Sequence, residues 1–410
     1  MIDTASLKST RNVTLLVLVA SLGYFVDIYD LLVFLIVRND SLKDVGVQQK
    51  DLFNVGISIL NWQMAGLLVG GIIWGVLGDK LGRIKVLFGS ITLYSLANFA
   101  NGMVHDPTSY TIVRVIAGIG LAGELGAGIT LVSETLSKQN RGYGTMFVAS
   151  LGLFGAAAAA IVAKQGWREA YYVGGSLGFL LLLLRLGTFE SGMFKNVSES
   201  KVSRGNFFLL FTNGERLKKY LCCILIGAPL WYVVGILISQ QPEFGNALHS
   251  KDILKPGDSI MYAYIGIAVG GMINGLLAQI TKSRKLVMYI FLILSAITAV
   301  IYLNAIGLSK HQYQWIWFLM GVGVGYWTTF VTIAAEQFGT NLRATVATTV
   351  PNFVRGSLIL ITLGFKALVK SQGMINSGYV MMAILTVIAL VALSLLKETF
   401  TKDLDYIEQI

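Results

Sequence analysis

Five charged residues lie inside long apolar stretches of this 410-residue chain, where a charge is costly and therefore informative. They are Asp27, Asp30, Glu124, Arg114 and Arg355. A charge at the centre of a bilayer costs about 2.5–3.5 kcal/mol on insertion scales, so such residues normally face a cavity or a partner. A buried carboxylate can take up and release a proton, and a buried guanidinium can hold a carboxylate or a phosphate.

The three acids are candidates for carrying a proton. Asp27 and Asp30 are three residues apart, so on a helix they lie within roughly 60° of each other on one face. Repulsion between two close carboxylates favours binding of a proton by one of them, and Glu124 could join them from another helix. The three histidines all lie in or beside connections between apolar stretches. If the coupling ion is a proton, we therefore predict that Asp27, Asp30 or Glu124 binds it.

The two arginines are candidates for holding an anionic substrate. Arg355 lies four residues after Pro351, where a helix kink would open backbone groups toward a cavity. Alternatively, Arg355 and Arg114 only neutralise the buried acids. Polar and aromatic side chains that could line the same cavity are Tyr24, Gln63, Trp231, Trp327 and Asn352. The alternative for each of these is ordinary packing or anchoring at the membrane interface.

The elements that position these residues are membrane helices. Hydrophobic residues make up 55% of the chain and charged residues 13%, which excludes an ordinary soluble globular domain. Apolar runs of about 20 residues recur throughout, each long enough to cross a bilayer as a helix. The predicted spans are 12–37, 54–77, 86–104, 110–136, 143–163, 169–189, 220–240, 259–281, 286–308, 313–337, 344–369 and 374–396. The predicted fold is therefore all-α, with twelve transmembrane helices and no alternating strands of a barrel.

The distribution of basic residues predicts the orientation. With the N-terminus inside, 19 of the 32 Lys and Arg residues lie in cytoplasmic segments and nine in outer loops. Both termini should therefore be cytoplasmic. The net charge of +10 is dispersed over the loops, which argues against a nucleic-acid-binding stripe. The first apolar run continues through Asp27 and Asp30, so we expect a retained helix and not a cleaved signal peptide.

The chain divides into two similar parts. Residues 195–219 form the longest hydrophilic stretch on the basic side and separate six spans from six. We predict an N-terminal six-helix bundle at 1–194, a cytoplasmic linker at 195–219, and a C-terminal bundle with a short tail at 220–410. The segment from Glu134 to Arg141 matches that from Glu336 to Arg343 at an offset of 202 residues. Such repeats place a binding site at their interface near the bilayer midplane.

A short motif identifies the family that the chain resembles. Between the second and third spans the sequence reads Gly75-Val-Leu-Gly78-Asp79-Lys80-Leu81-Gly82-Arg83-Ile84-Lys85, and the fourth span contains Arg114-x-x-x-Gly118-x-Gly120. Both patterns resemble signatures of the major facilitator superfamily. The resemblance implies two six-helix bundles around a central cavity, and it covers the whole chain.

The resemblance also implies a gate on the cytoplasmic side. Asp79 and Arg83 should hold that side shut, with Glu134 and Arg141 as partners, while Gly75 and Gly82 allow close approach and a tight turn. The alternative is a static loop that only obeys the bias of positive charge toward the cytoplasm.

Further short motifs favour particular branches of the superfamily. The segment from Gly23 to Asp30 and the pattern Glu190-Ser191-x-x-Phe194 resemble sugar, metabolite and aromatic-acid proton symporters. The fifth span runs from Gly152-Leu-Phe-Gly155 into an alanine tract without the proline that is usual in proton-driven exporters. Uptake is therefore the expected direction.

The combined expectation is a secondary transporter of the cytoplasmic membrane that moves a small organic anion, either a carboxylate or an aromatic acid, with protons. It would work by alternating access as a monomer, with the proton gradient as its energy source and without a cofactor or metal. A sugar or polyol symporter, an anion exchanger, a proton-driven exporter and a non-transporting solute sensor remain alternatives. An enzyme or a nucleotide-driven pump is not expected, because the chain has neither a His-Glu-x-x-His motif nor a phosphate-binding loop.

Overall fold

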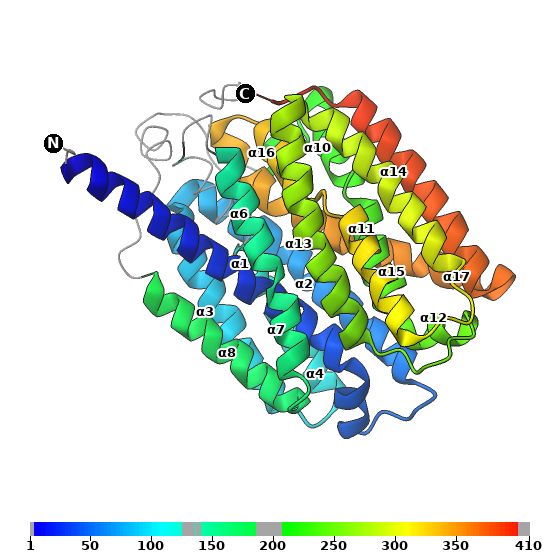
Figure 1. Ribbon diagram of the computed structural model, residues 1–410. Coiled ribbons are helices and arrows are strands. Elements are labelled where there is room, and N and C mark those ends of the chain that lie inside the picture. The colour runs from blue at the N-terminus through cyan, green and yellow to red at the C-terminus, as the bar shows by residue number, and fades with distance from the viewer. Residues whose placement is uncertain (1–3, 125–135, 137–140, 186–206, 401–410) are drawn as a thin grey trace.

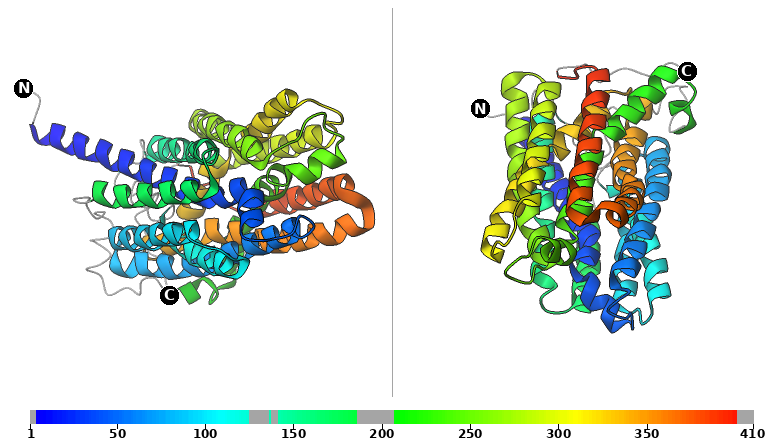
Figure 2. Two further views of the ribbon diagram at one scale, coloured as in Figure 1. Left: turned by 90° about the horizontal axis from the view of Figure 1, so that it is seen from below. Right: turned by 90° about the vertical axis from the view of Figure 1, so that its right-hand side faces the viewer.

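The computed structural model describes residues 4–124, 136, 141–185 and 207–400. Within these ranges the chain is helical and contains no strand. Figure 1 shows that α1 begins and α17 finishes at the same end of the bundle, which we call the terminal end. The opposite end, where the connections 45–51 and 248–255 lie, is called the distal end. Figure 2 shows most helices running side by side between the two ends.

Each of the twelve predicted spans coincides at least in part with described helix. The N-terminal helices are α1 (Thr4–Asp44), α2 (Leu52–Leu81), α3 (Arg83–Gly102), α4 (Pro107–Leu121), α6 (Arg141–Leu153), α7 (Gly155–Val162) and α8 (Trp167–Leu184). The C-terminal helices are α10 (Gly214–Leu225), α11 (Ala228–Tyr232), the π-helix η2 (Val233–Ile238), α12 (Gln241–Ala247), α13 (Pro256–Thr281), α14 (Arg284–Leu303), α15 (Lys310–Gly323), α16 (Trp327–Glu336) and α17 (Thr340–Leu395). A short 3-10 turn, η1 (Phe207–Leu210), precedes α10.

The helix boundaries agree with some of the predicted ones and differ from others. The last two predicted spans, 344–369 and 374–396, both lie in α17, and Gly373, whose φ of 76° is not helical, separates them as predicted. The backbone angles at Pro351 are helical, and the kink predicted at this residue stays a prediction. The helix α10 begins at Gly214, inside the predicted linker, because the side chain of Asn213 accepts hydrogen bonds from the backbone N–H groups of Glu215 and Arg216.

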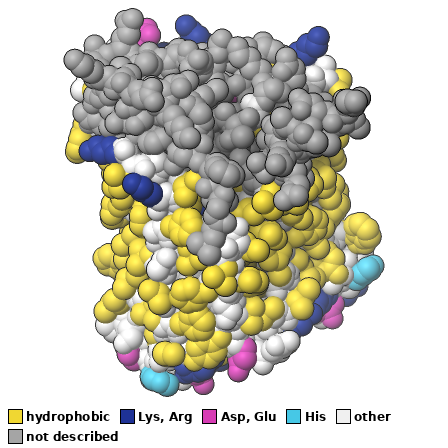
Figure 3. Space-filling view, turned by 90° about the vertical axis from the view of Figure 1, so that its left-hand side faces the viewer, with side chains coloured by type: hydrophobic (Ala, Val, Ile, Leu, Met, Phe, Trp, Pro, Cys, Tyr) yellow, Lys and Arg dark blue, Asp and Glu magenta, His cyan; other side chains and the backbone are white. Residues whose placement is uncertain are grey.

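The surface of the bundle is suited to lipid. By length and composition alone, six of the described helices could cross a membrane. Large apolar side chains such as Leu183, Leu360 and Ile280 are exposed on the helices. Figure 3 shows a broad apolar band on one face, with charged side chains and histidine gathered at the distal end. A lipid-facing band between polar ends agrees with the predicted membrane-spanning arrangement.

The two sets of helices pack against each other along two seams. In one, α2 lies along α17, and in the other α13 lies against α6 and α7. The first seam is tight because α2 carries small residues toward α17. A Cβ at Gly71 would lie 3.0 Å from the Cβ of Asn352, and one at Gly75 would lie 3.2 Å from the Cα of Thr345. Residues on both sides of these seams therefore meet inside the bundle.

After α17, a carboxylate helps to hold the chain against the terminal end. Glu398 accepts hydrogen bonds from the Ser283 hydroxyl at 2.6 Å and from the backbone N–H groups of Arg284 and Lys285, both at 3.1 Å. These N–H groups open α14, where a negative charge is stabilised by the helix dipole. Desolvation raises the pKa of Glu398, but the hydrogen bonds from Ser283 and from backbone N–H groups lower it more, and the net pKa is below the usual 4.5.

Replacement of this carboxylate should destabilise the protein in a pH-dependent way. We expect Glu398→Gln to lower the free energy of unfolding by about 1 kcal/mol at pH 7, because a helix cap and its charge are lost. A lowered folded-state pKa stabilises the protein above the unfolded-state pKa, and this contribution disappears as the pH falls through the folded-state value. The gap between wild type and variant should therefore close below pH 4.5.

Thermal unfolding of the purified protein in detergent, followed from pH 3 to pH 8, measures this gap. Glu215→Gln is the control, because Glu215 is an exposed glutamate near the start of another helix. Equal stability of the two variants at pH 7 would contradict the assignment of Glu398 as a cap.

Candidate functional site

A small cavity lies between the N-terminal and C-terminal helices, well inside the bundle. Its volume is about 10 Å³, which is room for about one water molecule. It is lined by Tyr24, Ile28, Leu153, Leu230, Trp231, Tyr264, Ile267, Trp327 and Arg355. Side chains from α1 and α6 thus face side chains from α11, α13, α16 and α17.

An ion pair joins the two sets of helices at this cavity. Asp27 of α1 and Arg355 of α17 are both buried, and the Oδ2 atom of Asp27 lies 3.5 Å from Nη2 of Arg355. Apart from this pairing, neither carboxylate oxygen has a hydrogen-bond partner within the described part of the chain. Removal of one member would leave the other as an uncompensated buried charge, so an anionic ligand that pairs with Arg355 would take the place of Asp27.

Two indole rings enclose the guanidinium of Arg355. Its Cζ atom lies 5.8 Å from the ring centroid of Trp231 and 5.6 Å from that of Trp327, and the two rings meet edge to face at 6.4 Å. Such cation–π contacts stabilise a charge that has left water. Among the described residues, the Nε atom of Arg355 and the indole Nε1 of Trp231 have no hydrogen-bond partner. Unpaired buried donors beside a cavity indicate a place for a ligand acceptor.

Breaks in two helices position these indoles. The seventh span stops at Leu225 and restarts at Ala228 with Pro229 in its first turn, and Trp231 follows in α11. The tenth span stops at Gly323, and Trp327 is the first residue of α16. Interrupted helices at mid-membrane depth occur where the chain lines a cavity, because free backbone groups need polar or protein surroundings.

Asn352 lies one turn before Arg355 and links it to the N-terminal helices. Its Oδ1 accepts a hydrogen bond from Nη1 of Arg355 at 3.4 Å, and its Nδ2 donates to the carbonyl of Ala122 at 2.8 Å and to that of Thr348 at 2.7 Å. Asn352 is therefore fully paired and is not among the residues that line the cavity. Its predicted contact with substrate stays a prediction.

Three other predicted site residues form a separate cluster inside the N-terminal helices. Arg114 of α4 donates to the side chain of Gln63 at 3.3 Å and to the backbone carbonyl of Asp30 at 3.4 Å. The rings of Phe34 and Tyr171 lie 5.7 and 5.6 Å from its guanidinium. The cluster has no member in the lining of the central cavity. A role for Asp30 in proton coupling, or for Arg114 and Gln63 in substrate binding, stays a prediction.

Glu124 has a partner that the sequence-based set did not include. Its carboxylate forms an ion pair with Arg185, which follows α8, and both side chains are buried. The pair packs against α1 at Gly23, where an added Cβ would collide with both side chains. Arg185 lies inside the predicted span 169–189, so the same signal that identified Glu124 applies to it. Tyr264 was also missed, because a tyrosine within an apolar run has no distinguishing pattern.

The predicted gate motif is described only in part. Gly75 packs against α17, and its carbonyl accepts a hydrogen bond from Thr345 Oγ1 at 3.3 Å. Gly82 separates α2 from α3 with φ 98°, a backbone conformation that favours glycine. Glu134 and the side chains of Asp79, Arg83 and Arg141 lie outside the described part, so the gate itself stays a prediction. In the matching C-terminal segment, Arg284 pairs with Glu336 at 2.9 Å.

The chain is similar in sequence and in fold to known transporters. A metabolite carrier of Haemophilus influenzae, named "Putative metabolite transport protein", is 26% identical over 94% of this chain and 96% of its own length. The 3-(3-hydroxyphenyl)propionate transporter of Escherichia coli is 31% identical over 38% of this chain and 40% of its own. A double tryptophan mutant of XylE has a similar structure, with a TM-score of 0.73 at 16% identity, over 96% of this chain and 97% of that one.

The sequence model of the family described as the Major Facilitator Superfamily matches residues 15–363 of this chain. This match covers most of the chain, and the XylE structure confirms the predicted fold class of two helical bundles. The relatives are transporters, which confirms that the chain is a transporter and not an enzyme. The chain belongs to the major facilitator superfamily.

Proposed function

We propose that this protein takes up a small organic anion, either a carboxylate or an aromatic acid, together with protons by alternating access. The observation that carries the proposal is the ion pair of Asp27 with Arg355 at a cavity between the two sets of helices. The pair has one member on each side of the interface. Its breaking and reforming can therefore be linked to relative movement of the two sets.

The charges suggest how proton and anion would be coupled. A substrate carboxylate and the carboxylate of Asp27 are alternative partners for Arg355, because both are planar acceptors that a guanidinium can hold. When Asp27 binds a proton, Arg355 loses its counterion and can accept the substrate carboxylate. When substrate leaves on the other side, Asp27 must release its proton to pair with Arg355 again. In this scheme one proton accompanies each carboxylate group that Arg355 binds.

The lining of the cavity favours a planar apolar body on the substrate. The rings of Tyr24, Trp231, Tyr264 and Trp327 surround Arg355, and aromatic rings pack well against one another. The E. coli relative is named for an acid that carries a phenyl ring. A cavity of about 10 Å³ does not hold such a molecule, so substrate must enter while the helices are further apart.

The remaining assignments belong to the same proposal. The halves that move would be residues 1–194 and 220–410, joined by the linker 195–219 and working as a monomer in the cytoplasmic membrane with both termini inside. Asp30 and Glu124 would be further carriers of the proton, and Arg114 and Gln63 would contact substrate in another conformation. The motif from Gly75 to Arg83 would close the cytoplasmic side with Glu134 and Arg141.

Uptake into proteoliposomes tests the coupling. We expect an inward proton gradient to drive accumulation of a labelled aromatic carboxylate in the wild type. Asp27→Asn should abolish the effect of the gradient, because asparagine can neither bind nor release a proton. Arg355→Lys should reduce uptake at least tenfold, because a single ammonium loses the two-point contact with a carboxylate.

Asp44→Asn is the matched control, since Asp44 belongs to an ion pair with Arg168 at the distal end, within the N-terminal helices. It should leave uptake unchanged. Gradient-driven accumulation of a neutral sugar in place of an acid would contradict the proposed substrate class. Unchanged gradient dependence in Asp27→Asn would contradict its role in coupling.

Ligand binding tests the aromatic part of the site. We expect Trp327→Leu to weaken binding of benzoate-type acids about tenfold, since an aromatic pair contributes about 0.5–1.5 kcal/mol beyond buried area. Binding of a short aliphatic carboxylate should change much less. Quenching of tryptophan fluorescence during titration measures both affinities in detergent.

Trp315→Leu is the control for this titration, because Trp315 is 62% exposed on the outside of the bundle. An equal loss of affinity for aromatic and aliphatic acids in Trp327→Leu would mean that the indole supports Arg355 and does not contact the substrate ring.

A further inference from the structure

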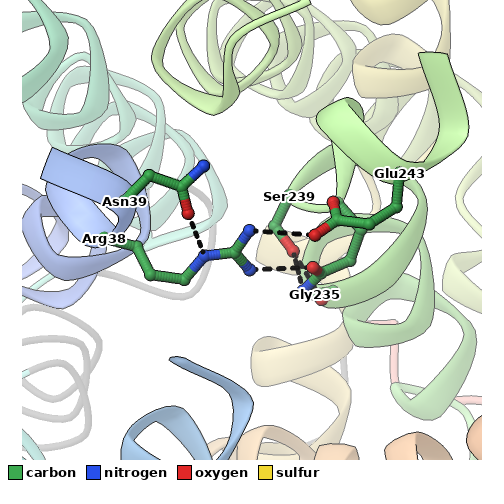
Figure 4. Close-up of polar contacts among 6 residues, drawn as sticks. Arg38, Asn39, Gly235, Ser239 and Glu243 are labelled. Carbon is green, nitrogen blue, oxygen red and sulfur yellow. Dashed lines mark hydrogen bonds and ion pairs between the residues drawn. The ribbon is translucent and has the colours of Figure 1, made fainter. Parts of the chain in front are cut away.

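A second buried arginine connects the two sets of helices near the distal end. Arg38 of α1 is 2% exposed, and its Nη1 atom donates to the side-chain oxygen of Gln240 at 2.8 Å. Its Nη2 atom forms an ion pair of 3.4 Å with Glu243 of α12. Figure 4 shows the guanidinium of Arg38 reaching from α1 across to the helices that carry Ser239 and Glu243.

The arrangement around Arg38 is built for this contact. Its Nε donates to the side chain of Asn39 at 3.2 Å, so the edge that faces α1 is fixed while the Nη atoms point across the interface. On α2, a Cβ at Gly56 would lie 2.6 Å from the Cδ of Arg38, so the absence of a side chain there leaves room for the arginine stem. A buried guanidinium whose three nitrogens are all paired holds one geometry far better than a flexible surface pair.

The partners of Arg38 lie at an irregular point of the seventh span. Gln240 falls between the π-helix η2 and α12. Its Nε2 donates a hydrogen bond at 3.3 Å to Ser239, the residue that follows η2. A π-helical turn is a local distortion that often marks a functional position.

We propose that Arg38, Gln240 and Glu243 form a latch that keeps the distal end closed, and that the transporter must open it once in every cycle. The inference rests on the proposed alternating access. Under the predicted topology the distal end is the outer side, so this latch would control entry of substrate from outside. The gate motif predicted between α2 and α3 lies at the terminal end, so the latch is its counterpart across the membrane.

The latch and the central ion pair share one helix. Arg38 follows Asp27 by 11 residues on α1, which corresponds to about 16 Å along the helix axis. Movement of α1 away from the C-terminal helices must therefore break both contacts. The contact of Lys366 with Asn54 at 3.5 Å also joins the two sets at this end, but it is exposed and contributes little.

A distance measurement between spin labels across the distal end tests the latch. The labels are placed at Gln49→Cys and Ile253→Cys, two exposed positions on opposite sides of the interface, after Cys222→Ser and Cys223→Ser. We expect one dominant short distance with Arg38 intact. Arg38→Ala and Glu243→Gln should each raise the ratio of long to short distances, about tenfold for Arg38→Ala. The ratio for Arg38→Lys should lie between the ratio for Arg38→Ala and that of the parent protein, because the charge remains but the two-point contact is lost.

The control is Lys310→Met, which removes an ion pair of 2.7 Å with Asp258 inside the C-terminal helices and should leave the distances unchanged. If folded Glu243→Gln and Arg38→Ala both keep the parent distribution, the latch is refuted. Should Arg38→Ala fail to fold, Glu243→Gln and Gln240→Leu decide the matter. The measurement needs neither substrate nor gradient, so absence of carboxylate uptake would refute the proposed function and leave the latch standing.

Discussion

The ion pair between Asp27 and Arg355 is the constraint on which the rest of the interior depends. Two charges in an apolar interior are tolerated only together, because each alone would carry a large desolvation penalty. The pair spans the boundary between the N-terminal and C-terminal helices. The two charges are therefore buried together only when this boundary is closed. The indoles of Trp231 and Trp327 complete the enclosure by covering the faces of the guanidinium.

The long first helix carries two charged residues that contact the C-terminal helices at different depths. Asp27 meets the C-terminal helices at the central cavity, and Arg38 meets them again near the distal end. Between these positions, Asp30 points away into the N-terminal helices, where a Cβ at Gly174 would collide with its Oδ1 atom. Positions three residues apart on a helix differ by about 60° in direction, so their side chains can contact different helices. One continuous helix thus holds residues for the interface and for the packing of its own half.

Much of the fold could be predicted from the sequence, because a lipid environment imposes a strong and local signal. Apolar runs of about 20 residues and the glycines of the loop motif are visible without knowledge of tertiary contacts. The start of the seventh span was predicted too late because it depends on a single local feature, the cap provided by Asn213.

The candidate site could be predicted only as a set of buried charges. Their pairing depends on which helices become neighbours, and no periodicity in the sequence encodes that. Arg355 was recognised as a buried cation, but nothing in its surroundings in the sequence indicates Asp27, which lies 328 residues earlier, as its partner. Arg38 lies just beyond the predicted first span, so it resembled an ordinary loop arginine until α1 proved to continue to Asp44.

The small size of the cavity bears on how binding is driven. With room for about one water molecule, the closed site has Arg355 surrounded by Asp27 and two indoles in place of a substrate. Each of these neighbours imitates one part of an aromatic acid, since Asp27 supplies a carboxylate and the indoles supply aromatic rings. Binding of such an acid would exchange similar contacts and would not create a new charged site in the membrane. The net energy of binding is then small compared with the contacts involved, which allows release on the far side.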